Sequence, residues 1–440
     1  MWRQKVLRSS RGGTHALVRA VAFGLAGVMA LATIPSRALS AQGRLASPVK
    51  DSTLVALDDN GLRIHSVDGR RQFKLRGFLL LDGRFVPSDR TDALPNGFAI
   101  RLSRLIVDVN VNPWLAVRLM PDFYVTGGTP AMADAFFDVY FSKRWWLRVG
   151  KQKTVFGWER WQFETDMAFA ERSIASMLGS NRDEGAVLTA DLANGRGEVA
   201  FGVFNGIPDG GANGDGDAND AKDFEARVLL RPVIRPASQG WTIGASATHG
   251  VMRAAGTSLG LPHFSTVAAS QFFSFRESSG AIADGERDRL NAFTFVHFGT
   301  MGFYAEGYRD QQMVRRTTTL SRVSTSGMTA VVDWVLTGEP SVQGGVNPSK
   351  PFDPDKGQWG AFQMAARVAH VGIGDEAFPV LADSAVAARS ATELGVDLNW
   401  NITRLTKAQL QLTNTSFRSG ATTGNRAAEQ FALLRLQLYF

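Results

Sequence analysis

The 440-residue sequence contains no cysteine and only six histidines. Without cysteine the chain forms no disulfide bond and has no thiolate chemistry. Dedicated zinc sites use histidine and cysteine ligands at short, paired spacings, and no such spacing occurs in this chain. The sequence therefore predicts neither a metal site nor a cofactor.

Long apolar runs are also absent, apart from one near the amino terminus. Residues 20–34 form this run, which at about 15 residues is short for a transmembrane helix. Small residues at Ala38 and Ser40 follow it at the spacing of a signal-peptide cleavage site. The basic residues that precede the run are Arg3, Lys5, Arg8, Arg11 and Arg19. The pattern predicts a signal peptide over residues 1–40 and an exported protein, with an uncleaved anchor as the alternative.

A large net charge is absent once the predicted signal peptide is set aside. The chain has 48 basic and 41 acidic residues. Six of the basic residues and none of the acidic residues precede position 41, which leaves 42 against 41. Bulk charge therefore gives no reason to expect a nucleic-acid partner, and any preference for anions must come from local placement of charge.

What the sequence does contain is alternation of apolar and polar residues. In 431–440 the even-numbered residues from Ala432 to Phe440 are apolar, whereas Arg435 and Gln437 have the other parity. A strand places alternate residues on opposite faces. Because one face stays apolar and the other carries charge in segment after segment, the pattern predicts an all-β transmembrane antiparallel barrel of about 16 strands.

The predicted barrel occupies residues 71–440 and follows a polar, irregular periplasmic segment at 41–70. Short and long connections alternate, as in outer-membrane barrels. Residues 272–275 resemble a further strand and are assigned to a loop, while 338–357 is unusually long for the short-turn side. The predicted strands are 71–85, 104–112, 114–122, 136–142, 145–150, 183–192, 196–208, 222–232, 240–249, 288–298, 301–313, 325–337, 358–370, 391–400, 403–415 and 428–440.

Aromatic residues recur near the ends of the predicted strands. Amphipathic rings favour the interface between acyl chains and headgroups. The aromatic core of a soluble β-sandwich is the alternative, but it does not explain why one parity is charged throughout. The residues concerned are Trp114, Trp145, Trp146, Trp241, Trp334, Trp400 and Tyr439.

The acidic, glycine-rich segment 209–220 partly matches a calcium-binding loop. The bidentate glutamate required at the twelfth position of such a loop is missing. A plain surface loop is therefore the preferred interpretation.

A series of short motifs runs through the chain in a fixed order: 60–69, 77–85, 98–105, 147–153, 156–159, 169–173, 181–185, 336–339, 360–367 and 394–400. In their order and spacing they resemble the phosphate-selective porin O and P family over roughly residues 60–440. The resemblance implies a homotrimer of sixteen-stranded barrels in the bacterial outer membrane, whose third loop folds into the pore. It also implies a row of basic side chains along which anions move.

The function expected from this resemblance is passive uptake of inorganic phosphate, polyphosphate or other small anions through a water-filled channel. An anion in a narrow lumen loses hydration, and fixed guanidinium and ammonium groups compensate for the loss. The expected surroundings are outer-membrane lipid and two further copies of the chain, without nucleic acid.

Nine basic residues are candidates for anion binding. Four lie on the polar parity of predicted strands: Arg84, Arg104, Arg118 and Arg148. Five lie at or in the third loop: Lys151, Lys153, Arg160, Arg172 and Arg182. Neighbouring carboxylates leave a second interpretation open, in which Asp82 and Glu159 neutralise adjacent arginines and Glu171 pairs with Arg172 to fix the loop.

The sequence leaves other functions open. The family tends to carry adjacent arginines where this chain has Arg101 and Leu102, and Arg101 has the lipid-facing parity unless a bulge resets the register. A general diffusion porin is therefore the main alternative. An enzyme is not expected, because no histidine has a recognisable catalytic partner motif. A purely structural barrel would require a plugged lumen.

Overall fold

The computed structural model describes residues 53–58, 61–86, 96–124, 130–207, 220–233, 239–254 and 258–440. The predicted signal peptide and almost all of the acidic segment 209–220 lie outside these residues. Within the described ranges, no helix has both the length and the apolar character needed to cross a membrane.

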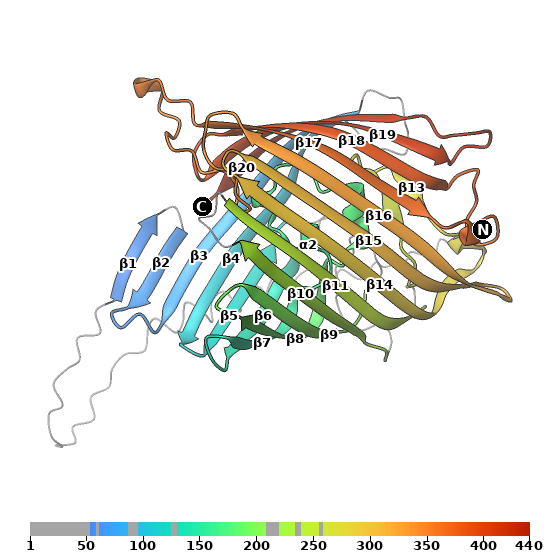
Figure 1. Ribbon diagram of the computed structural model, residues 1–440, viewed down its shortest axis with the longest axis horizontal. Coiled ribbons are helices and arrows are strands. Elements are labelled where there is room, and N and C mark those ends of the chain that lie inside the picture. Colours follow the sequence, from blue (N-terminus) through green and yellow to red (C-terminus); the bar gives the residue numbers. More distant parts are fainter. Residues whose placement is uncertain are drawn as a thin grey trace, which may run out of the picture. The chain divides into compact units, whose positions relative to one another are not determined.

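Sixteen antiparallel strands close into a barrel, as the alternation predicts (Figure 1). Each strand pairs with the next along the chain, and β20 pairs with β3 to complete the ring. The strands are β3 (Gln72–Phe85), β4 (Gly97–Asn112), β5 (Leu115–Asp122), β6 (Ala131–Tyr140), β7 (Trp145–Lys153), β8 (Arg182–Leu192), β9 (Gly197–Phe204), β10 (Asp223–Val233), β11 (Gln239–Arg253), β14 (Ala281–Phe298), β15 (Met301–Arg316), β16 (Thr319–Val335), β17 (Ala361–Ile373), β18 (Ala388–Asn401), β19 (Thr406–Ser419) and β20 (Glu429–Tyr439).

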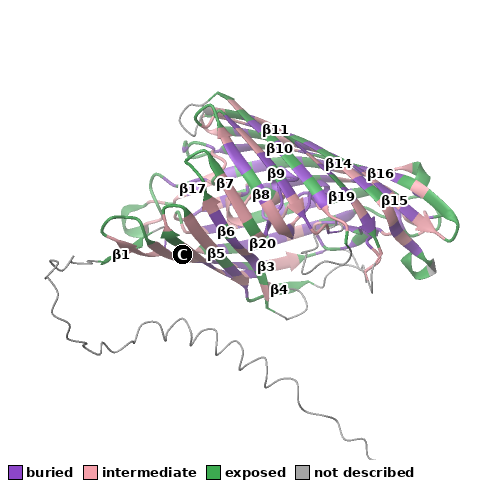
Figure 2. Cartoon of the chain, turned by 90° about the horizontal axis from the view of Figure 1, so that it is seen from below, coloured by how far each residue is buried: buried purple, intermediate pink, exposed green. Residues whose placement is uncertain are grey.

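The two faces of each strand differ in burial as the alternation requires. In β20, Leu434 on the outer face is 57% exposed, whereas Arg435 on the inner face is 2% exposed. Figure 2 shows buried and more exposed residues interleaved along the strands. Since the inner face is polar and the outer face apolar, the sheet suits lipid outside and water inside.

Exposed aromatic rings lie at the strand ends next to the short turns. Trp114, Trp145, Trp241 and Trp334 are each more than 40% exposed there. Trp146 and Tyr439 differ from them, because they have the inward parity of Arg148 on β7 and of Gln437 on β20. The remaining rings form the belt expected at one membrane interface.

The segment expected to be irregular at the amino terminus contains a hairpin. Strand β1 (Thr53–Asp58) pairs with β2 (Gly61–Ser66), and β2 pairs with residues 72–75 of β3. Strand β20 covers β3 only from Phe78 onward, so β2 occupies the edge of β3 that β20 leaves open. Periodicity does not reveal this hairpin, because β1 carries apolar residues on both faces.

Several strands are longer than the alternation predicts. Strand β4 begins at Gly97 instead of residue 104, and β14 begins at Ala281 instead of 288. Strands β15 and β16 are joined by two residues, where a loop over 314–324 was expected. These extensions lie at the long-loop end of the barrel, where the two faces of a strand carry similar residues and the alternation disappears.

The long loops carry the remaining elements. Residues 272–275 lie in a loop, as predicted, where β12 (Phe264–Ser265) pairs with β13 (Gln271–Phe273). The helical turns are α2 (Trp158–Trp161), η1 (Glu164–Asp166), η2 (Ile174–Leu178), η3 (Glu277–Ser279), η4 (Pro354–Lys356) and η5 (Asp375–Ala377). Apolar side chains of η2, of 258–275 and of 377–387 form the largest buried cluster of the protein.

We predict that a charge on the outer face destabilises the barrel according to its depth. Leu412 and Ser416 lie on the outer face of β19, and Leu412 is level with the exposed Val396. Leu412→Arg should cost about 2–4 kcal/mol and Ser416→Arg about 0–1 kcal/mol, because the penalty falls toward the interface. Urea titration of folding into lipid vesicles measures both values. Equal costs would contradict the assignment of the outer face to lipid.

Candidate functional site

The segment 154–181 between β7 and β8 spans the barrel interior and bonds to the strands opposite. The Glu306 carboxylate on β15 accepts the backbone N–H groups of Trp158 and Glu159. Further along, Asp397 on β18 accepts from the Ala170 N–H at 2.9 Å, and Gln411 on β19 accepts from the Glu171 N–H at 2.8 Å. The accepting side chains are all buried on the inner face. Side chains of the barrel wall thereby accept hydrogen bonds from four backbone N–H groups of the segment.

Gly157 allows the segment to turn back on itself. Its φ of 84° lies in the left-handed region, which favours glycine. A Cβ atom at this position would lie 3.1 Å from the Cα of Gly179. The two arms of the segment therefore approach each other closely, which positions α2 and η2 side by side.

Glu171 fixes the middle of the segment to two strands. Its carboxylate accepts from Arg101 on β4 at 2.8 Å and from Arg435 on β20 at 2.5 Å. Burial would raise the pKa of this carboxyl, but the charges of Arg101 and Arg435 hold it well below its usual range. Glu171 therefore remains ionised and attached over a wide pH range. The expected partner in the sequence was Arg172, which bonds elsewhere.

Arg101 reaches the interior because β4 contains a bulge. Leu80 pairs with Leu102 and Leu81 pairs with Ile100, so Arg101 is the extra residue. A bulge of this kind resets the alternation between faces. Arg101 consequently points inward, although simple parity assigns it to lipid.

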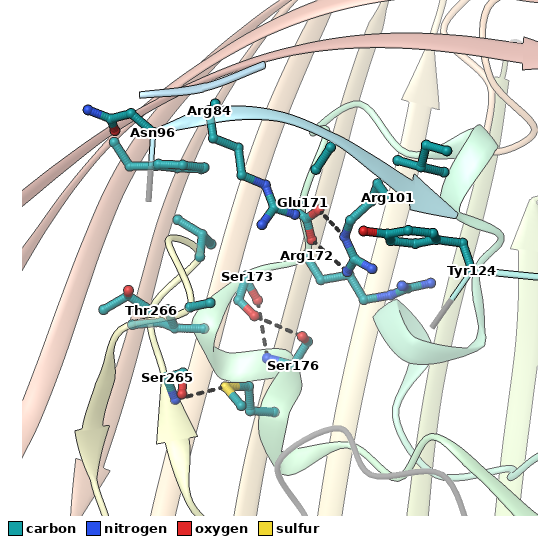
Figure 3. Close-up of a pocket in the computed structure, with 18 of the residues that line it drawn as sticks. Arg84, Asn96, Arg101, Tyr124, Glu171, Arg172, Ser173, Ser176, Ser265 and Thr266 are labelled. Carbon is teal, nitrogen blue, oxygen red and sulfur yellow. Dashed lines mark hydrogen bonds and ion pairs between the residues drawn. The ribbon is translucent and has the colours of Figure 1, made fainter. Parts of the chain in front are cut away.

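A first cavity of about 590 Å³ lies toward the long loops, and we call it the loop-side chamber. Arg84, Arg101, Arg160 and Arg172 line it, and Glu171 is the one carboxylate among the lining residues that the structure describes. Figure 3 shows Arg84 and Arg101 extending toward Glu171, with the Tyr124 ring beside Arg101. Burial lowers the pKa of Arg160 to about 10, so this guanidinium stays charged at neutral pH.

A second cavity of about 420 Å³, the turn-side chamber, lies toward the short turns. Its basic lining residues are Arg118, Arg148 and Lys153, and its acidic ones are Asp134 and Asp166. The Arg148 guanidinium lies 3.9 Å from the centre of the Phe136 ring, on which Arg118 also stacks at 5.6 Å. Each arginine is paired with one aspartate as well, Arg118 with Asp108 at 2.6 Å and Arg148 with Asp138 at 2.7 Å.

The unusually long segment 338–357 closes part of the turn-side chamber. Gln343 and Gly344 line the chamber, and a Cβ on Gly345 would lie 3.7 Å from the Cα of Asp166. Glu339 holds the segment together by accepting from Ser349 at 2.8 Å. This part of the chain therefore meets η1 inside the barrel, which its sequence did not indicate.

A cluster of charged residues lies between the two chambers. Glu164 on η1 accepts from Arg172 at 3.2 Å and from Arg104 at 3.5 Å. Arg104 also pairs with Asp122 at 2.7 Å. Burial would raise the pKa of Glu164, but Lys153, Arg172, Arg104 and Arg182 hold it well below its usual range.

The structure divides the nine predicted residues into three groups. Arg84, Arg160 and Arg172 line the loop-side chamber, and Arg118, Arg148 and Lys153 line the turn-side chamber. Arg104, Lys151 and Arg182 are buried and line neither chamber. In particular, Arg182 pairs with Asp134 at 2.6 Å.

Lys153, at the end of β7, turns toward the segment 154–181, and the backbone of β7 is unusual three residues earlier, at Gly150. This glycine has a φ of 128° and lies opposite Gly185 on β8. The Lys153 ammonium group donates to the Gln162 carbonyl at 2.6 Å.

In the described part of the chain, no group of three histidine, aspartate or glutamate side chains is placed to hold a metal ion.

The fold is similar to that of solved outer-membrane proteins of low sequence identity. The outer membrane channel DcaP of Acinetobacter baumannii superimposes with a TM-score of 0.56 and 8% identity, over 84% of this chain and 98% of that chain. OmpTdeltaL8, a loop L8 deletion mutant of the Vibrio cholerae outer membrane protein OmpT, gives 0.50 and 10%, over 84% and 100%. A search of curated proteins found no match.

The family comparison covers the barrel itself. The sequence profile described as phosphate-selective porin O and P matches residues 76–440. The match begins within β3 and extends to the last residue, so it includes both chambers and the segment between them. The chain therefore belongs to the phosphate-selective porin O and P family and forms an outer-membrane channel.

Proposed function

We propose that this channel favours anions and serves passive uptake of phosphate or other small anions. The observation that carries the proposal is the excess of basic over acidic side chains in both chambers. Among the described residues, four arginines and one glutamate line the loop-side chamber, and three basic and two acidic residues line the turn-side chamber. An anion that crosses the barrel meets fixed positive charge on either side of the segment 154–181.

The arrangement suits transport better than tight binding. Arg118 and Arg148 are each paired with one aspartate, and Arg84 lies 3.5 Å from Asp82. Paired guanidiniums retain free N–H groups, since each has five donors, but their net attraction for an anion is reduced. A series of moderate sites lets an ion enter and leave again.

The segments 154–181 and 338–357 are the elements that we propose narrow the lumen. The first bonds to inner-face residues of β15, β18, β19 and β20. The second contributes Gln343 and Gly344 to the turn-side chamber. Each enters from a different end of the barrel, so the narrowest part lies where they meet near η1.

A general diffusion porin is the second candidate. The pairing of lumen arginines with Asp108, Asp138 and Asp82 favours it, because a neutralised lumen would not discriminate between ions. The two candidates differ in the expected permeability ratio of anions to cations.

Reconstitution in planar bilayers tests the channel function directly. Under a KCl gradient we expect a reversal potential of the sign that indicates anion permeation, because of the basic lining. Added inorganic phosphate should reduce the chloride current as it occupies the chambers. Cation selectivity without phosphate block would contradict the proposal, and a ratio near one would support the general diffusion porin.

Charge removal in the turn-side chamber should weaken the selectivity. We expect Arg118→Ala combined with Arg148→Ala to lower the anion-to-cation ratio about fivefold, which corresponds to about 1 kcal/mol. Arg309→Ala is the control, because Arg309 is exposed on the outer parity of β15. Reversal potentials are measured at an ionic strength of about 0.1 M, which limits the screening of the chamber charges by salt. An equal effect of both variants would contradict a role for the chamber.

We also propose that residues 1–40 are removed on export and that the barrel forms homotrimers. The basic residues, the apolar run and the small residues near the amino terminus support removal of residues 1–40. The family resemblance supports the homotrimer. Amino-terminal sequencing of protein from outer membranes should begin after Ser40. Chemical cross-linking in the membrane should yield a trimer, and a monomer alone would contradict the assembly.

A further inference from the structure

We infer that the Glu164 carboxylate is a tethered anion that occupies the oxyanion-binding position between the two chambers. The inference rests on the proposed anion-conducting function and deepens it, by naming the site and the residue that sets its affinity. Its basis is the arrangement of Arg104, Lys153 and Arg172 around Glu164, combined with the bonds that hold these cations in place.

Arg172 is held by the segment itself. Its Nε donates to the Glu159 carbonyl at 3.0 Å and its Nη2 donates to the Gln162 carbonyl at 2.8 Å. Its remaining amino group, Nη1, donates to Glu164 at 3.2 Å. The guanidinium is therefore fixed by two backbone carbonyls, independently of Glu164.

Arg104 and Lys153 are held in the same way. Arg104 is 7% exposed, and its Nε donates to Asp122 at 2.7 Å while its Nη1 faces Glu164. The Lys153 ammonium group donates to the Gln162 carbonyl at 2.6 Å. The two arginines thus meet at the Glu164 carboxylate and the Lys153 charge acts on it, but none of the three cations depends on Glu164 for its position.

The carboxylate itself uses only part of its bonding capacity. Both arginines donate to the same oxygen, Oε1. The other oxygen, Oε2, is buried and has no hydrogen-bond partner among the described residues. An oxyanion with more oxygen atoms would use these donors more completely, since guanidinium groups bind phosphate through paired N–H groups.

The position of the cluster connects it to the path of the ion. Arg172 lines the loop-side chamber and Lys153 lines the turn-side chamber, so Glu164 lies between a cation of each. A permeating oxyanion must displace or pass this carboxylate. Glu164 therefore keeps the affinity at this point low and prevents a tightly bound ion from blocking flux.

The test compares Glu164→Gln with Asp166→Asn in planar bilayers, with inorganic phosphate as the probe. Both substitutions remove one negative charge from η1. Asp166, however, accepts a bond only from Thr165 within the described chain and contacts no arginine. We expect both variants to become more anion-selective. Glu164→Gln alone should tighten phosphate block of the chloride current, by about tenfold, because it frees preorganised guanidiniums.

A third variant identifies the cations responsible. Adding Arg172→Met to Glu164→Gln should return the phosphate block to the wild-type value, since one of the two guanidiniums is then missing. Equal phosphate block in Glu164→Gln and Asp166→Asn would overturn the inference. Weaker block in Glu164→Gln would also overturn it, because Glu164 would then orient the arginines instead of competing with the anion.

Two controls keep the result interpretable. Heat-modifiable migration on gels shows whether each variant forms the barrel, and Glu164→Ala replaces Glu164→Gln if the amide impairs folding. The wild-type reversal potential tests the proposed anion preference separately. A cation-selective wild type would remove that function, whereas the difference in phosphate block between the Glu164 and Asp166 variants tests the tethered carboxylate alone.

Discussion

The pairing of β20 with β3 is the contact on which the rest of the structure depends, because it converts an open sheet into a ring without edges. In a membrane every backbone polar group must find a partner within the protein. Arg435 carries this closure on the inner face, where it binds Asp82 across the seam at 2.7 and 2.8 Å. The same guanidinium binds Glu171 of the inner segment. Closure of the barrel and attachment of the segment therefore share one side chain.

Most charged side chains in the interior belong to ion pairs. The proposed anion preference rests on the excess of basic residues that line the two chambers. Buried ions require partners because an isolated charge is costly to desolvate. Arg182 and Arg104 satisfy this requirement with Asp134 and Asp122. Under the proposed function, arginines that line the chambers use the N–H groups left over from ion pairs to meet a passing anion. Arg101 and Lys153 have both functions in the fold, since they bond to the segment 154–181 and also line a chamber.

Sequence patterns predicted the barrel well and the interior less well. Alternation located all sixteen strands, because the contrast between a lipid face and a water face is a local property of each strand. It missed residues 97–103 and the hairpin β1–β2, where both faces of the strand are alike. Of the nine basic residues that it selected, six line the chambers and three, Arg104, Lys151 and Arg182, are buried. Parity alone left two orientations open for Arg101, toward lipid or, with a bulge, toward the interior, and the bulge in β4 decides for the interior.

By itself, the sequence determined the compartment, the strand number and the direction in which most side chains point. These follow from period-two alternation and from the family motifs, which depend on neighbours along the chain. Only the tertiary structure decided which cations are buried in ion pairs, because partners such as Asp134 of Arg182 and Asp82 of Arg435 lie far away in sequence. Glu164 is the clearest example. It lies 60 residues from Arg104, and its role as a partner of two guanidiniums arises only when the segment 154–181 is held against the opposite wall.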